Sequence, residues 1–199
     1  MGKELYDNIP SKVGDLLNDV RNGRIGLPDL QRPFVWKDSK VRELLDSMMK
    51  GYPIGYIMLW SSPEDYENTS HIGTNDKIYK RPDDLVIDGQ QRLTALLAAM
   101  YGVSIKDKNY EDRRIHISFN PLTREFAVWT PAYERNPEWV SDISTVFEAD
   151  QEHTISRFRK AFIKTVNEGR EKNNESLLTE DDEDVVETNI NDLLNLKIY

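Results

Sequence analysis

The sequence predicts one domain of mixed α and β structure, and three patterns support this prediction. Apolar residues recur at helical spacing in several segments, apolar runs of strand length occur twice, and two alternating segments flank a short turn. Of the 199 residues, 38% are hydrophobic, so the chain can form the core of one ordinary domain but hardly of two.

Two amphipathic helices are expected in the first part of the chain. The first covers residues 12–22, with Ser11 as its N-cap, and the second is capped by Asp38 or Ser39 and ends at Gly51. Each has four apolar residues at helical spacing, which are Val13, Leu16, Leu17 and Val20 in the first and Val41, Leu44, Leu45 and Met48 in the second.

Three strands are expected beside these helices. Residues 24–27 form a short strand, and the apolar runs 55–60 and 85–87 have the length and character of buried strands. The polar stretch 61–81 between those runs has no period, and we expect it to be a surface loop or an insertion.

The second half of the chain continues the mixture of helix and strand. A helix is expected from Gln90 to Tyr101, closed by Gly102, followed by a β-hairpin over residues 115–128 and a further helix over residues 155–166.

The C-terminal part of the chain is strongly acidic. Of 26 basic and 35 acidic residues, two bases and nine acids fall in residues 171–199, which leaves 24 bases and 26 acids in residues 1–170. The five consecutive acids at 180–184 predict a solvated linker or the exposed start of a helix over residues 185–196. We therefore place the folded domain at residues 1–170 and an acidic linker, or the start of a C-terminal helical region, at residues 171–199.

The composition excludes several classes of protein. The chain has no cysteine, which excludes disulfide bonds, thiolate zinc sites and cysteine nucleophiles. No stretch approaches the ~20 apolar residues of a membrane-spanning helix and no signal peptide is visible, so we expect a cytoplasmic protein without membrane partners. The nearly neutral residues 1–170 exclude a uniformly basic nucleic-acid-binding surface, although not a local basic cleft.

The segment Asp88–Thr94 has the sequence D-G-Q-Q-R-L-T and lies between an expected strand and an expected helix. The first turn of a helix presents backbone N–H groups and a partial positive charge, so such a junction attracts anions. Gly89 permits close approach of a ligand. Gln90 and Gln91 add amide donors, and the planar guanidinium of Arg92 suits a phosphate group.

Arg92 lies in the first turn of the expected helix, where a cation opposes the helix dipole at a cost of typically ~0.3–1 kcal/mol. Either a bound phosphate or a carboxylate such as Asp88 would compensate this cost. An ion pair of Asp88 with Arg92 or with Arg32 that only locks the turn is equally compatible with the sequence. The spacing of the residues leaves both interpretations open.

The segment Gln31–Trp36, within the irregular proline-bounded loop 28–36, is a second candidate. Its Arg32 could join Arg92 around one anion. Phe34 or Trp36 would either stack on a base or anchor the segment in the core, and the core is the commoner place for large rings.

Other phosphate-binding and metal-binding motifs are absent. The sequence has no G-x-x-x-x-G-K-[ST] loop and no G-x-G-x-x-G turn. Its three histidines, His71, His116 and His153, are far apart and lack metal-ligand spacing, so we expect no histidine-based nuclease centre.

Two segments in this order, Leu27–Trp36 (L-P-D-L-Q-R-P-F-V-W) and Asp88–Leu96 (D-G-Q-Q-R-L-T-A-L), resemble the N-terminal domain of the GmrSD-type modification-dependent restriction endonucleases. That family belongs to the ParB and sulfiredoxin-like superfamily, and the resemblance covers residues 10–150. It implies an α+β fold with a mixed sheet and packed helices, in which the D-G-Q-Q-R turn contacts the phosphates of a nucleoside triphosphate.

The resemblance also implies roles for individual residues. Carried over by position, the nucleotide-binding residues are Gln31, Arg32, Asp88, Gly89, Gln90, Gln91, Arg92 and Thr94. Asp88, Gln91 and Arg92 would be catalytic, and Asp88 would hold Mg²⁺. The chain departs from the family in having no histidine-rich nuclease motif after residue 150, and glutamine stands where sulfiredoxin chemistry needs a cysteine, which excludes that activity.

Two functional hypotheses follow. The first is binding and hydrolysis of a nucleoside triphosphate that regulates modification-dependent DNA restriction in antiviral defence, with DNA reached through a partner nuclease domain or subunit. Gln31 or Gln91 would then orient water, and Arg32 and Arg92 would stabilise phosphoryl charge. The alternative is a non-catalytic DNA- or partner-binding module of such a system, which keeps the turn as a scaffold. Direct nuclease activity is not expected, because the chain has few histidines and no carboxylate cluster.

Overall fold

A mixed sheet of five strands is the largest β element of the computed structural model, which describes residues 6–28, 33–61, 69–70, 77–78 and 82–198. The strand order is β3 (Met58–Ser61), β6 (Asp84–Asp88), β2 (Ile25–Pro28), β4 (Thr69–Ser70) and β5 (Lys77–Ile78). β2 and β6 are parallel, and the other neighbouring strands are antiparallel. The expected mixed sheet is therefore confirmed.

The stretch 61–81, expected to be a surface loop or an insertion, contributes β4 and β5 to this sheet. Its residues 62–68, 71–76 and 79–81 lie outside the described part of the chain.

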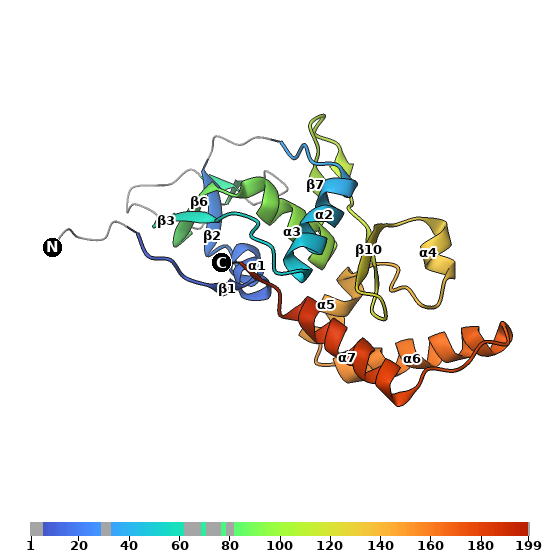
Figure 1. Cartoon of the computed structure of the whole chain (residues 1–199). Helices are drawn as coiled ribbons and strands as arrows, with labels where there is room; N and C mark the ends of the chain where they lie inside the picture. The colour runs from blue at the N-terminus through green and yellow to red at the C-terminus, as the bar shows by residue number, and fades with distance from the viewer. Residues whose placement is uncertain (1–5, 29–32, 62–68, 71–76, 79–81, 199) are drawn as a thin grey trace.

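In the view of Figure 1 the helices lie mainly to the right of the sheet, and those of the C-terminal half extend away from it. Those in the described residues are α1 (Val13–Arg21), α2 (Asp38–Met49), α3 (Gln90–Tyr101), α4 (Pro131–Arg135), α5 (Ser144–Gln151), α6 (Ile155–Lys172) and α7 (Glu180–Leu194). The prediction of a mixed α and β fold is confirmed by this arrangement.

Three pairs of short antiparallel strands complete the described secondary structure. They are β1 (Ser11–Lys12) with β11 (Lys197–Ile198), β7 (Ile105–Lys106) with β8 (Asp112–Arg113), and β9 (Ile117–Asn120) with β10 (Glu125–Val128). The last pair is the hairpin expected over residues 115–128. The first pair brings the C-terminal strand next to α1, as Figure 1 shows.

Helix α3 lies at the centre of the fold, and its ends agree with the prediction. Every residue from Leu93 to Met100 is buried, and the helix contacts α1, α2 and α5. Gly102, with φ +63°, closes the helix in the left-handed region that glycine tolerates best. This buried helix holds the turn at its N-terminal end in a fixed place.

The predicted N-caps of the first two helices were wrong, and Lys37 stands at the N-cap of α2 in place of Asp38 or Ser39. Ser11 pairs with Ile198 in the β1–β11 ladder, and Lys12 is the residue that precedes α1. Pairing with a strand 187 positions away in the sequence determines the conformation here, and a local capping pattern cannot reveal such a pairing.

The apolar run 55–60 does not form the expected buried strand. Strand β3 begins only at Met58, lies at the edge of the sheet, and is exposed along its length. The preceding residues 54–57 instead cover the turn between β6 and α3. The run 85–87 does lie in a strand, but Ile87 is exposed.

The five acids at 180–184 form the start of α7, earlier than the helix expected over residues 185–196. Thr179 caps this helix: its hydroxyl accepts from the Asp182 backbone N–H at 3.2 Å, and its own backbone N–H donates to the Asp182 carboxylate at 2.9 Å. The backbone and hydroxyl donors of Thr179 lower the pKa of that carboxyl. Acidic side chains also stabilise a helix N-terminus through its dipole, so the charge run begins the helix.

Helix α7 packs against α5 and α6 and contributes to the core through Val186, Ile190 and Leu193. Residue 170, where we placed the domain boundary, lies within α6. The division of the chain at that residue stays a prediction.

A buried hydrogen bond of α7 gives a test of how firmly this helix is held. Asn189 is 4% exposed, and its Nδ2 donates to the Pro121 carbonyl at 2.7 Å. Replacing Asn189 by alanine leaves that carbonyl without this donor, so we expect the free energy of unfolding, measured in urea, to fall by about 1–3 kcal/mol. The exposed Thr188 on the same helix is the control, and T188A is expected to change stability by less than about 0.5 kcal/mol. Equal denaturation midpoints for N189A and wild type would contradict this assignment.

No helix in the described part of the chain combines the length and the apolar character that a membrane-crossing segment requires.

Candidate functional site

The turn between β6 and α3 is built around Gly89. Its φ of +93° lies in the left-handed region. A Cβ at this position would lie 2.4 Å from Cδ1 and 3.2 Å from Cα of Ile57. The backbone conformation and the close approach of residue 57 therefore both require glycine.

The N-terminal end of α3 opens at this turn. The first bond of the helix runs from the Leu93 N–H to the Gly89 carbonyl, at 3.0 Å. The amides that precede Leu93 therefore lie outside the hydrogen-bond ladder of the helix, at the positive end of its dipole. Asp88, the last residue of β6, has a carboxylate side chain that is 66% exposed beside this helix end.

Arg92 joins the turn to the segment that covers it. Its Nη1 donates to the Ile54 carbonyl at 2.7 Å, and its Nη2 donates to Asp88 Oδ2 at 3.2 Å. The Arg92 side chain is only 16% exposed. Gly55, with φ +84°, passes so close that a Cβ there would lie 2.5 Å from Arg92 Nη1. The ion pair between Asp88 and Arg92, one of the alternatives expected from the sequence, is therefore formed.

Gln91 connects the same turn to the second candidate segment. Its Oε1 accepts from the Val35 backbone N–H at 3.0 Å, and its Nε2 donates to the Pro33 carbonyl at 3.1 Å. The D-G-Q-Q-R turn is therefore in direct contact with residues 33–35 of the second candidate segment. Gln31 and Arg32, predicted on the opposite side of the site, lie outside the described residues.

The aromatic residues of the second segment anchor it. Phe34 is 3% exposed and belongs to the core, and Trp36 packs partly buried against the core with the ammonium of Lys40 4.3 Å from its ring centroid. Arg113 Nη1 donates to the Trp36 carbonyl at 2.9 Å. Of the two roles considered for these rings, the structure thus gives Phe34 the role of an anchor.

The two remaining nucleotide-binding candidates differ in exposure. Gln90 is partly exposed at the start of α3, whereas Thr94 is buried one turn further on. The assignment of both to a nucleotide stays a prediction.

The match with a known family covers almost the whole chain. A family model described as the N-terminal domain of the GmrSD restriction endonuclease matches residues 13–197. The chain belongs to this family. The match includes the D-G-Q-Q-R turn, the second segment and all of α7.

A relative of this GmrSD-family domain is an uncharacterized protein of Methanocaldococcus jannaschii. It is 34% identical over 102 residues, which make up 48% of this chain and 18% of the relative. The chain therefore spans less than a fifth of that longer protein.

Asp88 is the candidate metal ligand of the GmrSD-family turn. Within the described residues, no three histidine, aspartate or glutamate side chains come together in a metal-ligand set. A single exposed carboxylate nevertheless fits Mg²⁺, which proteins commonly bind through one or two carboxylates together with phosphate oxygens of a substrate.

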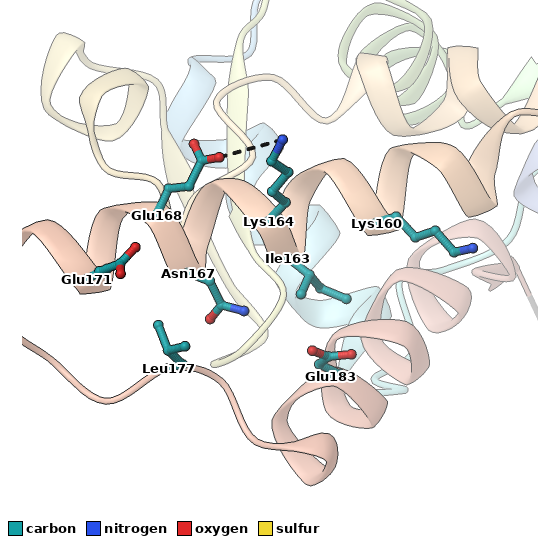
Figure 2. A pocket seen from close by; sticks show the side chains of 8 residues that line it. All are labelled: Lys160, Ile163, Lys164, Asn167, Glu168, Glu171, Leu177 and Glu183. Carbon is teal, nitrogen blue, oxygen red and sulfur yellow. Dashed lines mark ion pairs between the residues drawn. The ribbon is translucent and has the colours of Figure 1, made fainter.

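Two cavities lined by described residues lie away from this turn. The larger, of about 470 Å³, lies between α6 and the segment leading into α7, where Ile163 and Leu177 face the same space (Figure 2). Charged residues surround them, and Lys164 is 3.7 Å from Glu168. The smaller, of about 280 Å³, lies between the end of α2 and the end of α7.

Exposed apolar side chains lie beside the turn. They are Tyr56, Met58, Trp60 and Ile87. Met58 is the partner of Asp88 in the register of β3 and β6, and Ile87 precedes Asp88 in the chain. A partly apolar surface therefore adjoins the helix end.

Sequence reasoning missed the residues that cover and anchor the turn. Ile54 and Gly55 were assigned to no site, and neither was Arg113. A local signal was Gly55, because a glycine within an apolar run is unusual for a buried strand.

Proposed function

We propose that this GmrSD-family domain binds a nucleoside triphosphate at the Asp88–Arg92 turn and hydrolyses it to regulate restriction of modified foreign DNA. The observation that supports this most is the start of α3, where the amides that precede Leu93 lie outside the helical hydrogen-bond ladder beside the exposed Asp88 carboxylate. Family membership supports the link to restriction. Such a function belongs in the cytoplasm, with DNA reached through a partner nuclease domain or subunit.

The backbone amides, Arg92 and Asp88 each have a task in this proposal. The amides at the start of α3 bind phosphate oxygens, and Arg92, held by Ile54, adds a fixed positive charge that stabilises the phosphoryl group. Asp88 would hold Mg²⁺ directly or through water. When bound, the ion would neutralise phosphate charge and orient the triphosphate. Gln31 and Arg32 stay predictions for the opposite side of the site.

A thermal-shift screen with ATP, GTP, CTP and UTP, each with and without Mg²⁺, tests the proposal. A ligand present at a hundredfold excess over its Kd stabilises the native state by about 2.7 kcal/mol, which corresponds to roughly 5–10 °C in Tm for a chain of this size. The corresponding nucleoside is the control, because it lacks the phosphates. No shift with any of the four triphosphates would remove the proposal.

A second candidate is a non-catalytic DNA- or partner-binding module, and one observation favours it. Arg92 bonds to two protein groups, the Ile54 carbonyl and the Asp88 carboxylate, as it would in a turn that serves as a scaffold. Fluorescence polarisation with modified and unmodified DNA duplexes at two salt concentrations tests DNA binding, since phosphate contacts make affinity fall steeply with salt. Absence of salt-dependent binding to either duplex would remove the DNA-binding form of this candidate.

A further inference from the structure

Gln91 is a residue of the turn whose side chain reaches across to residues 33–35. Both ends of its amide contact backbone groups 56 and 58 positions earlier, at Val35 and Pro33. An amide held at its oxygen and at its nitrogen cannot rotate without losing both bonds. The Gln91 side chain is thus fixed in orientation.

Residues 33–36, which Gln91 contacts, also make contacts with Arg113. Arg113 bonds to the Trp36 carbonyl, its guanidinium carbon is 5.9 Å from the Phe34 ring centroid, and Phe34 is buried. The side chain of Val35 between them is exposed, so the Val35 backbone N–H lies near the surface. Its bond to Gln91 links the anchored segment to the first turn of α3.

We propose that Gln91 is a positioning residue, which sets the first turn of α3 relative to residues 33–35 and acts on the nucleotide through that link. This inference rests on the proposed nucleotide binding at the same turn. Each end of the Gln91 amide keeps one further hydrogen-bonding position, but its bonds to Val35 and Pro33 determine its orientation. The first functional hypothesis gave the orientation of water to Gln31 or Gln91, and the two backbone contacts of Gln91 favour a positioning role for this residue.

The variant Gln91→Met tests the link, because methionine has a similar length and makes neither bond. We expect the Kd for the triphosphate to rise about tenfold, and KM with it, while kcat at saturating nucleotide changes less than about threefold. Exchange of the Val35 backbone N–H with solvent should become about tenfold faster, because its acceptor is gone. A large fall in kcat with unchanged Kd and unchanged Val35 exchange would overturn the proposal in favour of a catalytic Gln91.

Two further variants separate positioning from direct contact and from general destabilisation. Arg113→Met loosens the same segment without touching the turn, so it should also weaken nucleotide binding about tenfold. An unchanged Kd in this variant, beside a weakened one in Gln91→Met, would indicate that Gln91 contacts the nucleotide directly and would overturn the proposal. Asn189→Ala, whose bond lies on α7, is the stability control and should leave the Kd unchanged.

The failure of this inference can be told from the failure of the proposed function. If the wild-type domain binds no triphosphate, the proposed function fails and the role of Gln91 fails with it. If the wild type binds and Gln91→Met binds equally well, only the positioning role is overturned.

Discussion

Replacing Gly89 by alanine is expected to abolish triphosphate binding and to destabilise the domain. The φ of +93° strains any residue with a side chain, at a cost of about 1–3 kcal/mol. The added Cβ would also meet Ile57, whose Cα would be 3.2 Å away, so the covering segment must shift. Because this strain and the shift of the covering segment would move the start of α3 proposed to bind phosphate, we expect affinity to fall by more than about a hundredfold.

Urea denaturation and isothermal titration calorimetry measure these two effects for G89A. Gly14 provides a matched control, because it lies within α1 and a Cβ there would meet nothing within 4 Å. G14A is expected to stabilise the domain by about 0.5–1 kcal/mol and to leave nucleotide affinity unchanged. A G89A variant with wild-type affinity would place the nucleotide away from this turn.

The second large effect is expected for Arg92→Met. Methionine fills a similar length but removes the donors to Ile54 and Asp88, so a backbone carbonyl and a carboxylate lose their partner. We expect a loss of about 1–3 kcal/mol in the free energy of unfolding and a loss of at least about a hundredfold in triphosphate affinity. Arg92→Lys should retain only part of the stability and part of the triphosphate affinity, because an ammonium lacks the planar guanidinium geometry that spans two acceptors.

Calorimetric titration of R92M and R92K with the best triphosphate of the screen gives the affinities. Lys164→Met is the control for loss of a cation, since Lys164 forms an exposed pair with Glu168 on α6. Its stability should change by less than about 1 kcal/mol and its nucleotide affinity should not change. Unchanged affinity of R92M for every triphosphate tested would remove the proposed site.

The elements predicted best are those whose signals are local. Helix α3 agrees with its prediction at both ends because Gly89 precedes it, Gly102 closes it, and its apolar residues lie between them. Helices α4 and α5 were not predicted, since they are short and each offers little room for an apolar period. Strands β1 and β11 were missed because two-residue strands pair across nearly the whole chain.

In the candidate site, too, contacts between residues close in sequence could be predicted, whereas contacts between distant residues could not. Because Asp88 and Arg92 are four residues apart, the sequence alone suggested their ion pair as one of two interpretations, and the pair is formed. The contacts of Arg92 with Ile54 and of Gln91 with Val35 could not be foreseen, because they join residues whose proximity depends on the whole fold. An apolar run cannot by itself distinguish a buried strand from a segment that covers a turn.

The antiparallel pairing of Ser11 with Ile198 makes the domain suited to circular permutation. The two ends of the described fold leave from the same small ladder beside α1 (Figure 1), so a short peptide could join them. New termini could then be opened at the exposed residues Asn173 and Asn174 between α6 and α7, where the backbone makes a tight turn. Such a rearranged chain would keep the turn at Gly89 intact while moving any attached protein to the far end of the molecule.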